Sequence, residues 1–246
     1  MPESSPSPTK SKRFETLLWV VFLIWAGVGL LSILLQTDAA QIRAWISQPL
    51  LQTFVLTCFQ WGDFLFHVLA AANLFLAVSS QLGLKKTSIS FGCIALLSGL
   101  VETWGTLTGF PFGSYVYTSN MGPMLAGTLP LAIPLAWWNI LSPLYLLTRH
   151  FLPKLPARAT CLLVALAATS MDWVMEPFAW KIKGYWIWEA GYIPWENYLS
   201  WFLLSFLLCR LAPLHSPYQA ALDRRLIAVP LLMLSFFISA RLIHGV

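Results

Sequence analysis

The sequence predicts an all-α membrane protein, a polytopic bundle of about seven transmembrane helices. Two observations carry this prediction. Of the 246 residues, 58% are apolar and 10% are charged, whereas soluble domains carry about a quarter charged residues. The apolar residues also gather in long runs, and a helix needs about 20 of them to cross the hydrocarbon core of a bilayer. We therefore expect the lipid bilayer to surround most of this chain.

Seven apolar runs are the expected spans. The first is too long for a signal peptide, so we expect it to remain as an anchor. Pro and Ser dominate the residues before it, which predicts a disordered cytoplasmic tail over residues 1–13 and a single integral membrane domain over 14–246. The predicted spans cover residues 14–35, 50–79, 88–103, 121–147, 158–180, 197–212 and 225–243.

The distribution of Lys and Arg predicts the orientation, because cytoplasmic loops are enriched in them. With seven spans, one set of loops holds eleven of the 15 basic residues, and this set includes the N-terminal end. We therefore expect a multi-pass protein of the inner cell membrane with that end in the cytoplasm. Loops 104–120 and 181–196 would lie together on the opposite side. The basic residues form no run or stripe, which argues against nucleic-acid binding.

Four carboxylates fall inside the expected spans, where a charge is costly and is a functional candidate. Counting from the cytoplasmic ends, Glu102 and Asp172 both lie roughly 20 Å deep and could face one another. Asp172 and Glu176 are one helical turn apart, and like charges in a low dielectric favour the protonated form of at least one of them. The alternative is structural, with these acids bonding partner helices or capping a helix broken at Pro177. The fourth carboxylate is Asp63.

Asp63 and His67 are also one turn apart, in the middle of the second span. They are candidates for a proton relay or for a hydrogen-bonding pair between helices, and the sequence leaves both open. The four histidines form no cluster, and the four cysteines lie far apart. We expect no metal site, because the ligand spacings of zinc, di-iron and haem centres are missing. A glycine-rich nucleotide motif is also missing, so we expect no cofactor.

Two loops on the expected outer side combine turn-forming residues with aromatic residues at every second position. These are residues 109–117 and 184–188. The pattern predicts ordered, hairpin-like loops packed on the helix ends. In each half an intramembrane acid precedes the aromatic pair by about a dozen residues, which is compatible with a weak parallel repeat. The alternative is a simple interfacial belt of aromatic residues. The two sets are Glu102 with Tyr115 and Tyr117, and Glu176 with Trp186 and Trp188.

Over roughly residues 100–205 the sequence resembles the CruF-like carotenoid biosynthesis proteins, a family of membrane hydratases of acyclic carotenoid ends. It differs from the family pattern at Glu176, where Asp is expected before the proline, and in an altered and shortened stretch over residues 192–197. The resemblance rests on Glu102, the loop 109–117, Gly122-Pro123, Pro130, Pro134, Trp137, Asp172, Glu176-Pro177, the loop 184–188, Pro194, Asn197 and Trp201.

The resemblance implies that water is added, without a cofactor, to the terminal alkene of a linear carotenoid such as lycopene, gamma-carotene or a bacterioruberin precursor. The product would be a tertiary alcohol. Asp172 is the expected proton donor, and Glu176 or Glu102 would take a proton from the incoming water. The implied partners are the carotenoid, the bilayer and other enzymes of the carotenoid pathway. The expected substrate-binding residues are Tyr115, Tyr117, Trp173, Trp186, Trp188, Asn197 and Trp201.

Two other classes of function remain open at this point. In a small membrane transporter the carboxylates would form a proton-coupled site, and Pro130, Pro134 and Pro143 would break the fourth span. An inverted repeat would mark such a protein, and the sequence displays none. A non-catalytic carotenoid-binding or lipid-binding protein would keep the pocket without turnover.

Overall fold

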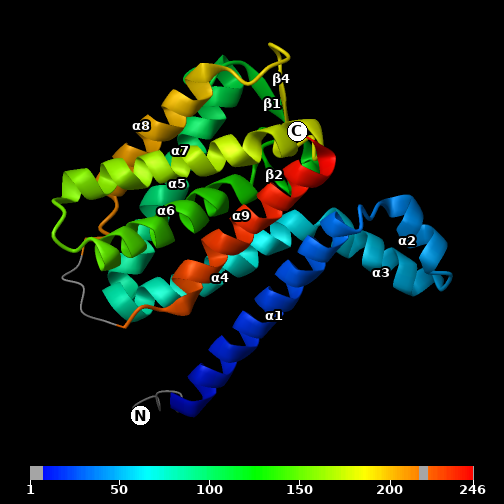
Figure 1. Cartoon of the computed structure of the whole chain (residues 1–246), viewed down its shortest axis with the longest axis horizontal. Helices are drawn as coiled ribbons and strands as arrows, with labels where there is room; N and C mark the ends of the chain where they lie inside the picture. The colour runs from blue at the N-terminus through cyan, green and yellow to red at the C-terminus, as the bar shows by residue number, and fades with distance from the viewer. Residues whose placement is uncertain (1–7, 216–220, 246) are drawn as a thin grey trace.

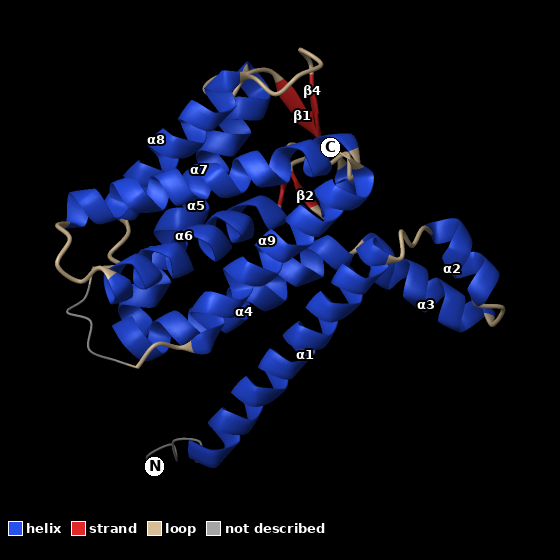
Figure 2. Ribbon diagram, in the orientation of Figure 1, coloured by secondary structure: helices blue, strands red, loops and turns tan. Residues whose placement is uncertain are grey.

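Helices dominate the computed structural model, which describes residues 8–215 and 221–245 (Figures 1 and 2). Two short two-stranded sheets lie in the connections between them. The helices are α1 (Pro8–Leu34), α2 (Ala39–Trp45), α3 (Pro49–Gln60), α4 (Gly62–Leu82), α5 (Leu84–Thr108), α6 (Ala132–Phe151), α7 (Ala157–Lys181), α8 (Trp195–Leu211) and α9 (Arg224–His244). The strands are β1 (Tyr115–Tyr117), β2 (Met124–Leu125), β3 (Leu129–Pro130) and β4 (Trp186–Trp188), and a 3-10 turn covers Ser119–Met121.

The predicted membrane helix bundle is confirmed. Within the described residues, α1, α4, α5, α7 and α9 are long and apolar enough to cross a membrane. The remaining two long helices, α6 and α8, pack among them, so the chain is an integral membrane protein built on seven long helices. Helix α6 contacts α4, α5, α7, α8 and α9, and its Trp137, Trp138, Leu141 and Tyr145 are buried. Since α6 faces protein on most sides, it needs less apolar character than a helix that faces lipid.

Two expected spans are wrong in detail. In the expected span 121–147, residues 121–131 form the end of the 3-10 turn and the β2–β3 hairpin, so helix α6 begins only at Ala132. Residues 50–79 form two helices, α3 and α4, that are interrupted at Trp61, whose backbone angles (φ −97°, ψ 4°) leave the helical range. The Trp25 indole of α1 donates a 2.9 Å hydrogen bond to the Gly62 carbonyl at this break. Helix α3 buries none of its residues, and the α2–α3 hairpin projects from the bundle (Figure 1). Mean hydropathy does not register such a break, because both halves are apolar.

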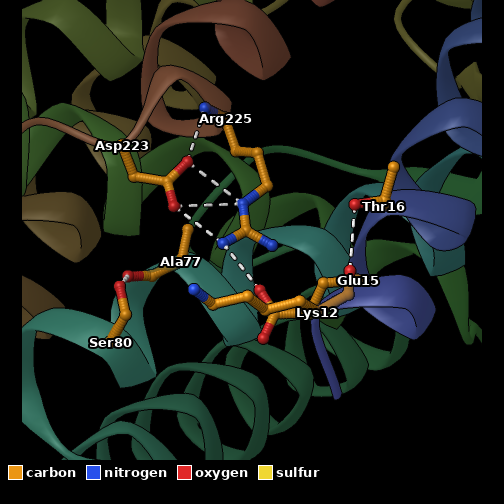
Figure 3. A network of polar contacts seen from close by, with 7 residues as sticks. All are labelled: Lys12, Glu15, Thr16, Ala77, Ser80, Asp223 and Arg225. Atoms are coloured by element: carbon orange, nitrogen blue, oxygen red, sulfur yellow. Dashed lines mark hydrogen bonds and ion pairs between the residues drawn. The ribbon is translucent and has the colours of Figure 1, made fainter. Parts of the chain in front are cut away.

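Helix α1 begins at Pro8, so residues 8–13 are helical, and the predicted disordered tail is wrong for them; residues 1–7 lie outside the described part. Figure 3 shows what holds this end of α1. The Arg225 guanidinium of α9 contacts Glu15 of α1 (Nη2–Oε2 3.3 Å) and Asp223 (Nη2–Oδ2 2.7 Å). Burial opposes ionisation of Asp223, but hydrogen bonds from Arg225 hold its pKa below the usual value. The first and last helices are therefore tied together.

The two loops with alternating aromatic residues pair with each other. β1 and β4 form an antiparallel ribbon in which Tyr115 faces Trp188, and Tyr117 faces Trp186. This differs from the expected hairpin within each loop, because the partner strand of each comes from the other loop. The pairing confirms that loops 104–120 and 181–196 lie on the same side. Side chains alternate along a strand, so the four aromatic rings point into the protein. The central pair, Val116 and Ile187, is exposed and points outward.

Candidate active site

Glu102 lies near the C-terminal end of α5, with only 4% of its surface exposed. Its carboxylate accepts hydrogen bonds from the Tyr115 and Tyr117 hydroxyls, both at 2.7 Å, and from the Trp137 indole at 2.9 Å. Burial, and then the charge of Glu102, raise the pKa of Tyr115 and Tyr117 well above the usual value. Both phenols therefore stay protonated and act as donors, and the three donors offset part of the cost of burying a charge on Glu102.

Glu176 occupies the matching place near the C-terminal end of α7. The indoles of Trp186 and Trp188 donate to its Oε2 at 3.1 and 3.3 Å, and the Asn197 amide of α8 donates to Oε1 at 3.1 Å. Each strand of the ribbon thus supplies two donors to the acid of the helix that precedes it. Glu176 is also buried, and its three bonds are longer than those of Glu102.

Asp172 is the least satisfied of the three acids. It lies one turn before Glu176 and is fully buried. Asn197 donates a 2.9 Å hydrogen bond to its Oδ2, whereas its Oδ1 has no hydrogen-bond partner among the described residues. A buried carboxylate with one donor, next to a second acid, is destabilised in its ionised form. The arrangement therefore favours a protonated Asp172 whose second oxygen is free to donate.

The site has two halves, which we call the half-sites: Glu102 with its three donors, and Glu176 with its three donors. An approximate two-fold rotation axis relates them. The register of the ribbon places the axis between Val116 and Ile187. The sequence order is helix, strand, helix in both halves, α5–β1–α6 and α7–β4–α8, and the chain runs in the same direction through each. Trp137 of α6 and Trp201 of α8 stack across this axis, with ring centroids 4.1 Å apart. This arrangement corresponds to the predicted parallel repeat and lacks the inverted relation expected of a transporter.

A small cavity of ≈ 40 Å³ lies between the half-sites. A buried water needs roughly 10–15 Å³ of such space, so the cavity has room for about two or three waters. Asp172 and Glu102 both line it, whereas Glu176 lies behind Asn197 and does not. The other lining residues are Phe112, Tyr115, Tyr117, Met121, Ile133, Ala136, Trp137, Ile140, Met175, Trp186, Trp188, Asn197 and Trp201.

The structure brings most of the predicted substrate-binding residues together and separates one. Tyr115, Tyr117, Trp186, Trp188, Asn197 and Trp201 line the small cavity, as Glu102 and Asp172 do. Trp173 does not: its side chain is 57% exposed, and the Arg241 guanidinium lies 5.0 Å from its ring. A step of one residue turns a helix by about 100°, so the neighbour of an inward-facing Asp172 faces outward.

Asp63 and His67 lie away from the three acids. Asp63 forms a 2.9 Å ion pair with Lys183, and the Asn139 amide donates to the His67 carbonyl at 3.1 Å and lies 3.4 Å from its ring Nδ1. Both residues line a second, larger cavity and bond partner elements. These contacts favour the structural alternative over a relay to the acids.

Trp137 is the main site residue that the sequence did not assign a role. It donates to Glu102 and stacks on Trp201, yet it lies 35 positions after the acid that it contacts. In the sequence, the one indication that Trp137 belongs to the site is its position after Pro130 and Pro134 in the pattern that resembles the family. As for metals, the described residues contain no group of three or more His, Cys, Asp and Glu side chains arranged to hold an ion.

Comparison with known proteins assigns the chain to a family. The family model described as "Carotenoid biosynthesis protein" matches residues 62–246, which include every residue of both half-sites. The bisanhydrobacterioruberin hydratase of Haloarcula japonica is 32% identical over 148 residues, which are 58% of this chain and 48% of that protein. The matched stretch therefore spans about half the length of this curated relative. No solved structure matches the chain.

Proposed function

Because the chain belongs to the carotenoid biosynthesis protein family, we propose that it is a hydratase, which adds water across the terminal double bond of an acyclic carotenoid and leaves a tertiary alcohol. The observation that carries this proposal is the pairing of unlike carboxyls around one small cavity. Asp172 has a free oxygen and a single donor, while Glu102 accepts three hydrogen bonds. Such a difference in environment is how a protein sets one carboxyl as acid and another as base.

Asp172 is the proposed proton donor. An unactivated alkene accepts a proton only from a well-placed acid, and the free Oδ1 of Asp172 belongs to a residue that lines the cavity. Transfer of its proton to the less substituted alkene carbon leaves a tertiary cation on the neighbouring carbon. Glu176 is a positioning residue in this scheme, because it shares the Asn197 amide with Asp172 and disfavours the ionised form of its neighbour.

The aromatic wall of the cavity fits the cation that follows. Trp137, Trp186, Trp188 and Trp201 surround the space with ring faces and edges and offer no nucleophilic side chain. A ring face stabilises a nearby cation by about 0.5–2 kcal/mol. The stacked pair of Trp137 and Trp201 is rigid, since both side chains are buried.

Glu102 is the proposed general base. As water attacks the cation, its oxygen forms the new bond, and one of its protons passes to the Glu102 carboxylate. Asp172 is then ionised and Glu102 protonated, so a proton must return from Glu102 to Asp172 before the next turnover. A second water in the cavity is a suitable carrier, because the volume of ≈ 40 Å³ holds more than one. The net reaction is alkene plus water to alcohol, and it needs no oxidant and no cofactor.

The Lys and Arg distribution supports a location in the cell membrane with the ribbon on the non-cytoplasmic side. In that orientation the acids lie in the outer part of the bundle, within reach of water. The polyene chain of the substrate would extend from them among the helices.

The origin of the oxygen tests the mechanism. We expect purified protein in detergent, with no added metal, nicotinamide or flavin, to convert lycopene to a hydroxylated product under an inert atmosphere. Mass spectrometry should place the label of isotopically labelled water in the tertiary alcohol. Label from dioxygen in place of water, or a strict requirement for iron, would contradict acid-catalysed hydration.

The tight packing behind Glu102 gives a second prediction. A Cβ on Gly105 would lie 2.7 Å from the Phe112 ring and 3.1 Å from the Tyr115 hydroxyl, and both side chains are buried. Gly105→Ala is therefore expected to displace Tyr115 and to lower kcat about 10- to 100-fold, as small misplacements at an active site do. Gly92→Ala is the matched control on the same helix, since a Cβ there meets nothing within 4 Å. Equal kcat values for the two variants would show that this packing does not position the site.

A further inference from the structure

A second cavity, of ≈ 330 Å³, lies between α1, the α2–α3 hairpin, the start of α4 and the outer half of α9. Its wall is mostly apolar and rich in aromatic residues, among them Trp25, Trp45, Phe59, Phe66 and Phe236. A cavity of this kind favours an apolar ligand with few polar groups. Trp45 and Phe54 give the α2–α3 hairpin an exposed aromatic surface that suits a position at the lipid interface, and from that position a ligand would reach this region from the membrane.

The charges at this cavity are already paired. Among the described residues that line it, one ion pair is present, between Lys183 and Asp63 at 2.9 Å, and both side chains are partly exposed. The ring of Phe236 lies 5.9 Å from the same ammonium. Since the two charges neutralise each other, the cavity offers little attraction to an ionic headgroup. An uncharged, lipid-soluble ligand fits it better.

The two cavities share a wall. Met121 and Met175 line both of them. Met175 lies three residues after Asp172 on α7, so the two side chains project from neighbouring positions on the helix. A methionine side chain has three rotatable bonds and adapts easily to a new neighbour. These two methionines therefore form the adaptable part of the wall between the apolar space and the acids.

We propose that the larger cavity holds the polyene chain of the substrate, while the reactive end passes between Met121 and Met175 to Asp172. The identity of the ligand rests on the proposed function. The α2–α3 hairpin then has a role as the cover of this polyene site. A third apolar groove, of ≈ 440 Å³ between α6, α7 and α9, shares no lining residue with the small cavity, so it does not deliver a chain end to the acids.

The native cysteines provide a test without mutation. Cys58 lines the larger cavity and Cys93 does not, and both are half-buried. In wild-type protein, lycopene at about ten times its Kd should slow modification of Cys58 by N-ethylmaleimide about tenfold, because the unoccupied fraction falls by that factor. Modification of Cys93 should stay unchanged. Peptide mass spectrometry separates the two sites, and equal rates for Cys58 with and without lycopene would overturn the proposal.

A matched pair of glycines on α1 tests the same site by obstruction. Gly29 lines the cavity, and its Cβ would lie 4.0 Å from Phe236, whereas a Cβ on Gly27 meets nothing within 4 Å. Lycopene has no chirality of its own, so a visible circular dichroism band reports the carotene held in the protein. Gly29→Phe should weaken lycopene binding about tenfold or more, because the ring fills the cavity. Gly27→Phe, and Ala167→Phe in the third groove, should bind as the wild type does.

These measurements test the polyene site separately from the hydration reaction, because neither cysteine modification nor circular dichroism requires product to form. Suppose that lycopene protects Cys58 in the wild type and that the glycine variants bind it as expected, but that the wild type adds no water. This result would refute the hydratase proposal and would support the polyene site. If the wild type hydrates lycopene, but Gly29→Phe binds lycopene as tightly as Gly27→Phe does, the polyene site is refuted and the hydratase proposal is not. Loss of binding in Ala167→Phe would move the chain to the third groove and would also overturn the proposal.

Discussion

Asp172→Asn is expected to lower kcat for hydration by about 10³-fold or more, because a positioned general acid contributes roughly 10²–10⁴ to the rate and no other acid has a free oxygen at this cavity in the described structure. The amide keeps the shape of the side chain but has no acidic proton. We expect no loss of thermal stability, because the protonated Asp172 carries no charge to lose and the amide oxygen of Asn can still accept the hydrogen bond from Asn197. Product analysis by chromatography and thermal unfolding in detergent measure the two effects.

Glu189→Gln is the matched control for this variant. Glu189 follows β4 directly, and its side chain is exposed. Glu189→Gln therefore removes one carboxyl group near the site but leaves the lining of the small cavity unchanged. The kcat of this variant should remain at the wild-type level. Wild-type turnover in Asp172→Asn would refute the assignment of the proton donor and would transfer that role to Glu102 or Glu176.

Glu102→Gln is expected to lower kcat about 10²- to 10³-fold by a different route, through loss of the base that accepts a proton from water. The amide group also brings donors of its own toward Tyr115, Tyr117 and Trp137, which are donors already. We therefore expect a modest fall in the unfolding temperature, since a buried donor without an acceptor costs about 1–3 kcal/mol.

Hydrogen exchange distinguishes the two acid variants. In deuterium oxide, Glu102→Gln still contains Asp172, so it should add a deuteron to the CH carbon of the alkene. When the cation then loses a hydrogen from one of its methyl groups to the Asp172 carboxylate, the recovered carotenoid keeps that deuterium. Asp172→Asn should place none. Mass spectrometry of unreacted substrate makes the comparison, and deuterium in the Asp172→Asn sample at the level of Glu102→Gln would contradict the division of roles.

The acids of the site could be predicted from the sequence because lipid penalises charge. A carboxylate within an apolar run has few structural explanations, and Glu102, Asp172 and Glu176 were identified on that basis alone. The alternating aromatic residues predicted extended segments correctly, since the period of two is a local property. The pairing of β1 with β4 joins residues about 70 positions apart, and no local pattern contains it.

The direction of side chains within the spans was the weaker part of the prediction. Trp173 is adjacent to Asp172 in the sequence but faces outward, while Trp137 contacts Glu102 from a distant helix. In a membrane protein both the core and the lipid-facing surface are apolar, so hydrophobic periodicity separates them poorly. The break at Trp61 was missed for the same reason, because α3 and α4 are apolar on both sides of it.

The approximate two-fold of the site is broken at the position one turn before each glutamate, and this has a stereochemical consequence. Asp172 lies four residues before Glu176, whereas the corresponding residue before Glu102 is the buried Ser98, which is not an acid. The proton therefore comes from the α7 wall only, and it reaches one face of the planar alkene. The carbon that receives it becomes a methylene group whose two hydrogens have different origins. A hydratase built in this way adds a solvent hydrogen with a single handedness, although the product itself carries no stereocentre at that carbon.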